Sequence, residues 1–168
     1  MNKLTKLAVC MAVSISAAGF VSSVYAASAT TTIPVSATVI QSCTITSGPL
    51  SFGNYNGISG AAIDVAGSMS PACTTGTTYS ISLDAGVGAG ANAGTRKLTG
   101  PVGASLAYGI YADAARTTAW GDGSFGTVLQ TGVGNGTVAT LQMYGRIPAS
   151  QNAPAGAYAD TITVTVTY

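Results

Sequence analysis

The side chains that could carry out chemistry are few in this 168-residue chain. There is no histidine, so the Ser/His and Cys/His pairs that activate a nucleophile cannot form. Two aspartates could act as acid and base, as in glycosidases, but Asp64 and Asp84 lie by expected strand ends. Asp113 and Asp122 lie in turn-like segments. The residues favour a non-enzymatic protein over an aspartate-based hydrolase, and we expect no cofactor and no metal site.

The first 26 residues have the pattern of a secretory signal peptide. Lys3 and Lys6 precede a mostly apolar run that closes on the small-x-small sequence of residues 24–26, which predicts cleavage after Ala26. A membrane anchor is the alternative, but serines interrupt the run and no stop-transfer flank follows. Cleavage would leave 142 of the 168 residues, enough for one domain with a single core.

Charge and cysteine content after position 26 narrow the function further. Four basic side chains stand against five aspartates, a net charge of −1, and there is no glutamate. Such a chain has no basic surface to hold nucleic acid or an anionic membrane.

Cys43 and Cys73 are the two remaining cysteines, and in an oxidising compartment such a pair predicts one disulfide. A reactive thiol pair or a metal site lacks both CxxC spacing and histidine.

Strand patterns recur along the whole chain, and segments rich in Gly, Asn and Asp separate them. Short strands spaced by such turns through one domain predict an antiparallel β-sandwich. We expect the aromatic side chains of Tyr108, Tyr111, Trp120 and Phe125 to lie in its core, and the alternative is that they are exposed for adhesion. The expected strands are residues 30–40, 43–52, 62–73, 77–83, 106–111, 127–130, 137–144 and 158–168.

The first and last of these segments alternate most strictly between apolar and polar side chains. A period of two over this length is typical of a strand with one buried face. In the last segment, "ADTITVTVTY", the apolar set is Ile162, Val164, Val166 and Tyr168. In the first, it is Ile33, Val35, Ala37 and Val39. The two strands either pair within one molecule or each serve a different molecule.

Four stretches of the chain resemble the spore coat U domain family. They are "SCTI" with "LSFGNY" (42–55), "CTTGTTYSISLDAG" (73–86), "LAYGIYADAARTTAWGDG" (106–123) and "YGRIPASQNAPAGAYADTITVTVTY" (144–168). The resemblance covers residues 27–168. The best understood members of this family are subunits of archaic chaperone–usher pili in Gram-negative bacteria.

The resemblance implies an incomplete immunoglobulin-like sandwich that lacks its last strand. In such subunits a periplasmic chaperone lends a strand to the open groove (donor-strand complementation). At the outer-membrane usher, the N-terminal arm of the next subunit replaces that strand (donor-strand exchange). Residues 27–41 would be the arm and residues 42–168 the pilin domain. The family's cysteine pair falls on Cys43 and Cys73.

The residue roles that the resemblance implies fall on the two alternating sets. Ile33, Val35, Ala37 and Val39 would be the donor strand, and Ile162, Val164, Val166 and Tyr168 the acceptor groove that also binds the chaperone. An open edge strand is normally protected by charge, proline or a bulge, and none of these interrupts residues 161–168. Pro34 fits less well, because it has no N–H to donate. Either position 34 lies at the margin of the inserted segment or Ile33 contributes little.

We therefore expect an exported structural subunit of an archaic pilus. It would pass through the periplasm, join other copies or sibling pilins head to tail, and build a surface fibre for adhesion and biofilm formation. The sequence leaves open whether it is a rod subunit or a minor adaptor. The alternative is a self-complemented secreted or spore coat protein with the same domain.

Overall fold

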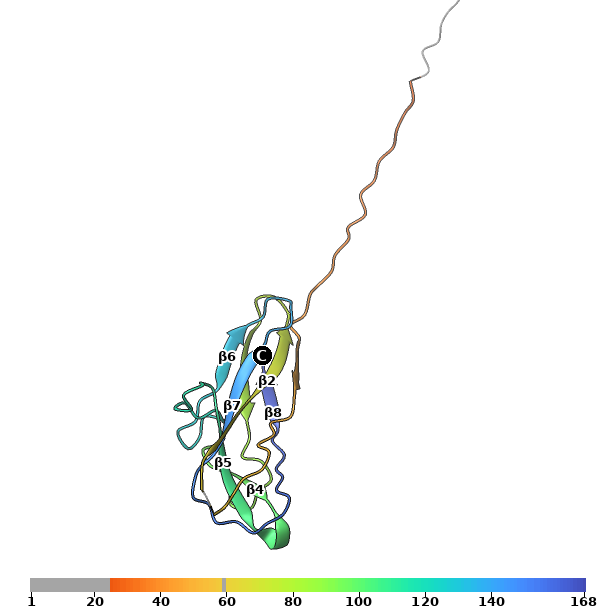
Figure 1. Ribbon diagram of the computed structural model, residues 1–168. Coiled ribbons are helices and arrows are strands. Elements are labelled where there is room, and N and C mark those ends of the chain that lie inside the picture. The colour runs from red at the N-terminus through yellow and green to blue at the C-terminus, as the bar shows by residue number, and fades with distance from the viewer. Residues whose placement is uncertain (1–24, 59) are drawn as a thin grey trace, which may run out of the picture. The chain divides into compact units, whose positions relative to one another are not determined.

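A computed structural model describes residues 25–58 and 60–168 of the chain (Figure 1). The expected signal peptide lies outside the described residues except for positions 25 and 26, so it stays a prediction. The chain divides into two units, Met1–Ala37 and Thr38–Tyr168. The described part of the first unit, residues 25–37, contains no helix or strand and is exposed throughout. No helix in the described part of the chain is long and apolar enough to span a membrane.

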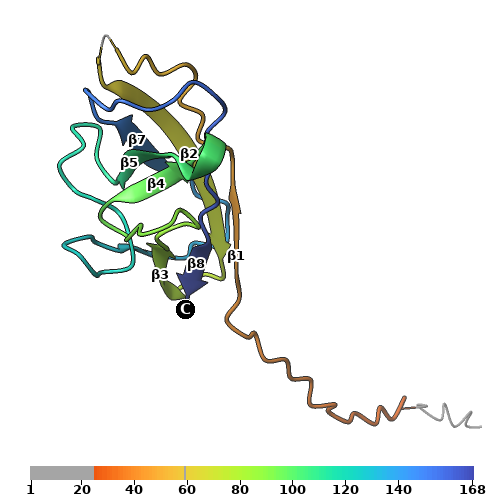
Figure 2. The same ribbon diagram turned by 90° about the horizontal axis from the view of Figure 1, so that it is seen from below.

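The second unit is built from two antiparallel sheets. In Figure 2, β4 and β5 lie in one layer, and β3 and β8 in the other. The larger sheet contains β1 (Cys43–Ser47), β2 (Ile63–Cys73), β7 (Leu141–Ile147), β5 (Ser105–Tyr111) and β4 (Arg96–Thr99), in that order. The smaller contains β6 (Gln130–Val133), β3 (Thr78–Leu83) and β8 (Val164–Thr167). A 3-10 turn, η1 (Pro101–Gly103), joins β4 to β5. The expected all-β antiparallel sandwich is confirmed.

Alternating side chains of both sheets build the core. In β3, Ile81 and Leu83 are fully buried, and they pack in one cluster with Met69 of β2 and Met143 of β7. The indole of Trp120 is also fully buried, and its Nε1 donates a hydrogen bond of 3.0 Å to the Ile81 carbonyl. Burying an indole is favourable only when its N–H finds an acceptor, and this bond supplies one.

The aromatic prediction is confirmed for two residues and wrong for one. Tyr108 and Trp120 are buried and Tyr111 is half-buried, but Phe125 is 72% exposed. Phe125 adopts a positive φ of 52° between Gly123 and Gly126, which also have positive φ. This left-handed turn directs the ring to solvent, and no sequence periodicity marks it.

Strand predictions were most accurate in the sheet interiors. Residues 62–73, 77–83 and 106–111 correspond to β2, β3 and β5. The segments 127–130 and 137–144 were placed too early, since β6 and β7 end three residues later, and the strand β4 was missed. The segments 43–52 and 158–168 were too long, and residues 30–40 form no strand. A strand needs a hydrogen-bonding neighbour, and an alternating pattern alone does not supply one.

A disulfide ties the start of β1 to the end of β2. The Sγ atoms of Cys43 and Cys73 are 2.03 Å apart, and the two residues face each other in the β1–β2 register. The predicted disulfide is therefore present. It fixes the first residue of an edge strand that has a single neighbour in its sheet.

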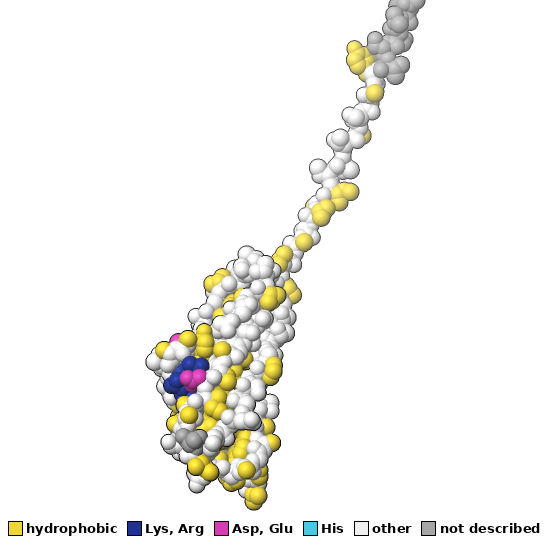
Figure 3. Space-filling view, in the orientation of Figure 1, with side chains coloured by type: hydrophobic (Ala, Val, Ile, Leu, Met, Phe, Trp, Pro, Cys, Tyr) yellow, Lys and Arg dark blue, Asp and Glu magenta, His cyan; other side chains and the backbone are white. Residues whose placement is uncertain are grey.

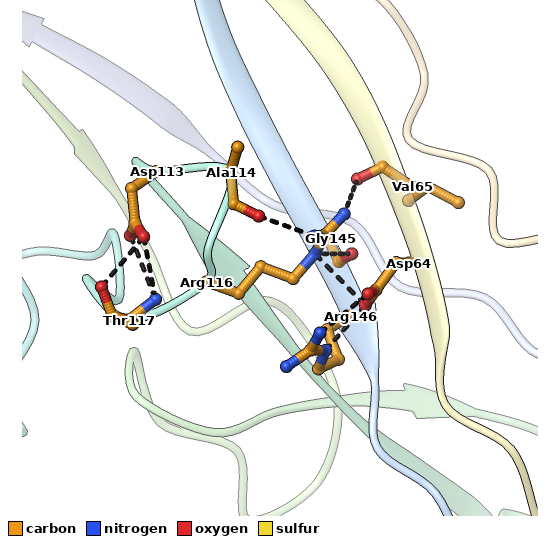
Figure 4. A network of polar contacts seen from close by, with 8 residues as sticks. All are labelled: Asp64, Val65, Asp113, Ala114, Arg116, Thr117, Gly145 and Arg146. Carbon is orange, nitrogen blue, oxygen red and sulfur yellow. Dashed lines mark hydrogen bonds and ion pairs between the residues drawn. The ribbon is translucent and has the colours of Figure 1, made fainter.

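Charged side chains join β2, β7 and the loop after β5 (Figure 4). Asp64 and Arg146 face each other in register, and two guanidinium nitrogens donate to the carboxylate at 2.7 Å. Arg116 lies 3.2 Å from the same carboxylate and donates to the carbonyls of Gly145 and Val65. The loop is thereby pinned to the outer face of the larger sheet.

Hydrogen bonds lower the pKa of three aspartates outside the core. The side-chain bond from Arg146 is the main cause that lowers the pKa of Asp64. Backbone N–H groups, first that of Thr117, lower the pKa of Asp113 to about 2. Bonds from Ser124 lower the pKa of Asp122. These aspartates lie in turns or at the sheet surface, in agreement with their predicted positions.

Removal of the disulfide should destabilise the domain. We expect Cys43→Ala with Cys73→Ala to lower the free energy of unfolding by about 3.5 kcal/mol, because the bond closes a loop with a sequence separation of 30. Urea unfolding followed by the fluorescence of Trp120, the single tryptophan, measures the change. The wild-type chain in reducing agent is the matched control and should behave as the double variant does. An unchanged midpoint would contradict the prediction.

Stability should depend on pH only in acid. A carboxylate with a lowered folded-state pKa stabilises the fold above its unfolded pKa of about 3.9, and this contribution disappears as the pH falls through the folded value. We therefore expect a constant melting temperature from about pH 5 to pH 7.5, where no histidine titrates, and a continuous fall from about pH 4 toward pH 2. Melting curves recorded across this pH range test the prediction. A sharp change in the melting temperature near pH 6.5 would contradict it.

Candidate functional site

The strands β1 and β8 are edge strands of the two different sheets, and they lie close to each other. β1 pairs with β2 alone and β8 with β3 alone, so within the described residues the far edge of each strand has no ladder partner. Each free edge presents unpaired backbone N–H and C=O groups. The sandwich is therefore open between β1 and β8.

A cavity of about 250 Å³ lies in this opening. Its floor is made by core side chains of the larger sheet, including Met69, Ile110 and Met143. One wall is the segment that follows β1, and the other is the segment that enters β8. The lining residues are Ser47, Gly48, Leu50, Phe52, Met69, Leu83, Leu98, Tyr108, Ile110, Met143, Asp160, Ile162 and Val164. We call this cavity and the two free edges the β1–β8 groove.

The surroundings of the groove are poor in charge. Asp160 is the single charged residue among those that line the cavity, and its carboxylate is engaged in hydrogen bonds. On the face shown in Figure 3, charged side chains gather mainly in one patch, and hydrophobic side chains are visible elsewhere on the surface. An apolar, uncharged groove favours an apolar occupant.

The four predicted acceptor residues do not all line the cavity. Ile162 and Val164 do, and Val166 is partly buried against the core. Tyr168 is 55% exposed and lies instead in a shallow depression with Tyr79 and Gly132. The threonines between these residues are exposed, so the alternation read from the sequence is present in the structure.

The predicted donor residues are exposed in the isolated chain. Ile33, Val35 and Val39 are 81%, 91% and 83% exposed, and Ala37 is exposed as well. Three large aliphatic side chains so close together in the sequence leave much apolar surface in water. Their role as a donor strand stays a prediction at this point.

A polar framework that the sequence reading missed lies beside the groove. Asp160 accepts hydrogen bonds from the Tyr108 hydroxyl at 2.6 Å and from the backbone N–H groups of Val87 and Thr161 at 2.8 Å. Asp84 accepts from the N–H of Thr163 at 2.9 Å. These bonds join the segment before β8 to β5 and to the loop after β3.

A buried arginine anchors this framework. Arg96 is 1% exposed, and its guanidinium donates to the carbonyls of Asp84, Leu83 and Trp120 at 2.8–3.1 Å. A buried guanidinium is tolerated only when its N–H groups are satisfied, as they are here by three carbonyl groups. The one sequence indication was a pair of charged residues at positions 96 and 97, which is more typical of a loop.

The pKa shifts agree with this arrangement. Burial raises the pKa of Tyr108, and the hydrogen bond to Asp160 raises it further, so the hydroxyl remains a donor. Burial opposes ionisation of Asp84, but bonds from Thr163 and Gly86 outweigh it and the pKa is lowered. Burial lowers the pKa of Arg96, and nearby Asp84 opposes this. No group of three or more His, Cys, Asp or Glu side chains suited to a metal lies in the described part of the chain.

Comparison with known proteins gives matches to a protein family and to a solved structure. The model of the Spore Coat Protein U domain matches residues 29–165. "Protein U" of Myxococcus xanthus is 36% identical over an alignment of 157 residues, and the match covers 85% of this chain and 87% of that protein.

One structural match is to a chain in the crystal structure of the CsuC–CsuE chaperone–tip adhesion subunit pre-assembly complex, from the archaic chaperone-usher Csu pili of Acinetobacter baumannii. The TM-score is 0.57 at 24% identity, and the match covers 78% of this chain but 40% of that one. At this identity the likeness shows a shared fold, in agreement with the expected immunoglobulin-like sandwich. The family model covers most of the sequence, and the chain belongs to the Spore Coat Protein U domain family.

Proposed function

We propose that this protein is a structural subunit of an archaic chaperone–usher pilus, which polymerises by donor-strand exchange. The observation that carries the proposal is the β1–β8 groove, where two free strand edges border an unfilled apolar cavity. Neighbouring strands lie about 4.8 Å apart, so a strand that bonds to both edges needs roughly 9.6 Å between them. Cα atoms of β1 and β8 approach within 8 Å in the isolated chain, so the inserted strand would have to part the two edges there. It would join the two sheets and cover the core side chains that now line the cavity.

The occupant we propose is the arm of another copy, residues 27–41. Ile33, Val35 and Val39 are exposed in the isolated chain, and burial of each would contribute about 1.5–3 kcal/mol before ordering costs. Ala37 would contribute less. Strand addition gives affinity through main-chain hydrogen bonds and specificity through alternate side chains, which suits this alternating arm.

Pro34 limits where the inserted strand can begin. It has no N–H, so one ladder bond would be lost if it lay between two neighbours. Placement of Pro34 at the margin of the groove avoids this loss, and Val35, Ala37 and Val39 then become the principal donor residues.

This arrangement generates a fibre. The arm and the groove are different surfaces of one chain, so contact between copies is head to tail and does not close on itself. Before assembly, a periplasmic chaperone would fill the groove, and an outer-membrane usher would direct the exchange. The protein would be exported by its signal peptide, and the fibre would serve in adhesion and biofilm formation. Family membership and the fold shared with the Csu complex chain support a pilus-type subunit.

A second candidate is a self-complemented secreted or spore coat protein. The description of the family as a Spore Coat Protein U domain favours it. In that case the groove would be filled within one molecule, and the intact protein would stay monomeric.

Charged side chains at the apolar positions of the donor strand should prevent polymerisation. We expect Val35→Asp with Val39→Asp to reduce heat-sensitive oligomers by at least about 100-fold, because two buried aliphatic contacts are replaced by carboxylates that resist burial. The measurement is electrophoresis of unheated and heated samples of the protein assembled in the presence of chaperone and usher.

Ser36→Asp with Thr38→Asp is the matched control, since these side chains would face solvent on the inserted strand. This variant should assemble as the wild-type chain does.

Deletion of residues 27–41 should leave a folded monomer that cannot polymerise. If both double variants assemble equally well, the assignment of Val35 and Val39 to the buried side of the donor strand is wrong. A wild-type chain that never forms such oligomers would favour the self-complemented alternative.

A further inference from the structure

The wall of the groove that enters β8 is not held by a regular strand ladder. β8 begins at Val164, whereas Asp160 and Ile162 already line the cavity. One backbone bond, from the N–H of Asp84 to the Thr163 carbonyl, ties this segment to the chain after β3. The segment 160–163 therefore needs other contacts to keep its position.

Two carboxylates supply these contacts from opposite sides. Asp84 follows β3 and accepts from the N–H of Thr163 at 2.9 Å, in the place where a ladder would have a backbone carbonyl. Asp160 precedes β8 and accepts from the N–H of Val87 at 2.8 Å, in the loop after β3. Each carboxylate thus holds the segment that carries the other one.

Asp160 also connects the wall to the opposite sheet. The hydroxyl of Tyr108, on β5 of the larger sheet, donates to its carboxylate at 2.6 Å. Tyr108 is 4% exposed and lines the cavity, so this bond spans the two sheets at the floor of the groove. Bonds to a charged acceptor are stronger than those between neutral groups.

The position of Asp84 is itself fixed. Its carbonyl accepts from Arg96 at 2.8 Å, and Arg96 also holds the carbonyls of Leu83 and Trp120. Gly86 lets the loop approach, because a Cβ at this position would clash with the carboxylate of Asp160. The contacts form one continuous framework from the buried arginine to the wall of the groove.

An unfilled apolar cavity is under pressure to close, because its lining lacks contact partners and protein interiors pack densely. A groove that had closed would first have to open before it could admit a strand. A strand that pairs with both edges requires a spacing of roughly 9.6 Å between them, and Cα atoms of β1 and β8 approach within 8 Å of each other in the isolated chain. Any further closure would make entry of a strand harder, so contacts that hold the wall in place favour entry.

We propose that Asp84 and Asp160 are positioning residues that form a clasp, which keeps the β1–β8 groove open for an incoming strand. The inference rests on the proposed function of the groove. The clasp acts before and during insertion. Afterwards, ladder bonds to the inserted strand hold the wall, so the two carboxylates affect the rate of strand uptake more than its reversal.

The test measures uptake of a labelled synthetic peptide of residues 29–41. The receptor is the full chain with Val35→Asp and Val39→Asp, which disables its own arm. In this background, Asp160→Asn and Asp84→Ala should each lower the association rate constant about tenfold, because each removes at least one hydrogen bond of ordinary net strength. The dissociation rate constant should change less than about threefold.

Two further variants make the result specific. Asp122→Asn removes the same charge from a loop aspartate that bonds to Ser124, and it should leave both rate constants unchanged. Tyr108→Phe keeps the ring and removes the bond between the sheets, so it should slow association and tests the clasp even if an aspartate variant fails to fold. Melting temperatures in the absence of peptide separate slow uptake from general instability.

The outcomes distinguish the two proposals. If the receptor with both aspartates takes up no peptide, the proposed function is wrong and the clasp falls with it. If that receptor takes up the peptide, and the variants Asp160→Asn, Asp84→Ala and Tyr108→Phe take it up at the same rate, the groove is an acceptor and the clasp alone is wrong. If these variants change only the dissociation rate constant and not the association rate constant, the clasp is also wrong.

Discussion

The apolar space between β1 and β8 is the feature on which the remaining structure depends. A β-sandwich is stable because two sheets bury their apolar faces against each other, and a gap at one edge leaves core side chains without contact partners. Here the gap exposes the sides of Met69 and Met143 to a cavity of about 250 Å³. Both backbone edges that border it are free within the described residues. A single missing strand accounts for both features, since it would supply hydrogen-bonding groups to the edges and side chains to the cavity.

Covalent and hydrogen bonds hold both segments that border the gap. Cys43 and Cys73 fix one border, because the disulfide holds the first residue of β1 to β2. The other border is held by the carboxylates and by the buried Arg96. No buried side-chain nitrogen or oxygen in the described part of the chain lacks a hydrogen-bond partner. The opening thus lies between two well-anchored segments, which suits the role proposed for the groove.

The sequence allowed prediction of those features that have a local pattern. Alternation was sufficient for β2, β3 and β5, and the two cysteines that follow the expected signal peptide were sufficient for the disulfide. β4 could not be predicted in this way, because its charged start is buried through bonds to carbonyls that are distant in sequence.

The same limit applies to the candidate site. Alternation identified Ile162 and Val164 as inward-facing, but the importance of Asp160 depends on Tyr108, 52 positions away. Tyr168 continues the alternating pattern beyond the end of β8, where the neighbouring contacts change.

Amide hydrogen exchange tests most directly whether the β1–β8 groove receives a strand from another copy. The full chain with its own arm disabled would be compared with and without a peptide of residues 29–41. The proposed assembly predicts that amides of both Cys43–Ser47 and Val164–Thr167 become strongly protected in the presence of peptide, while those of the other edge strands, β4 and β6, do not change. Unchanged exchange in β1 and β8, or protection confined to β4 or β6, would contradict it.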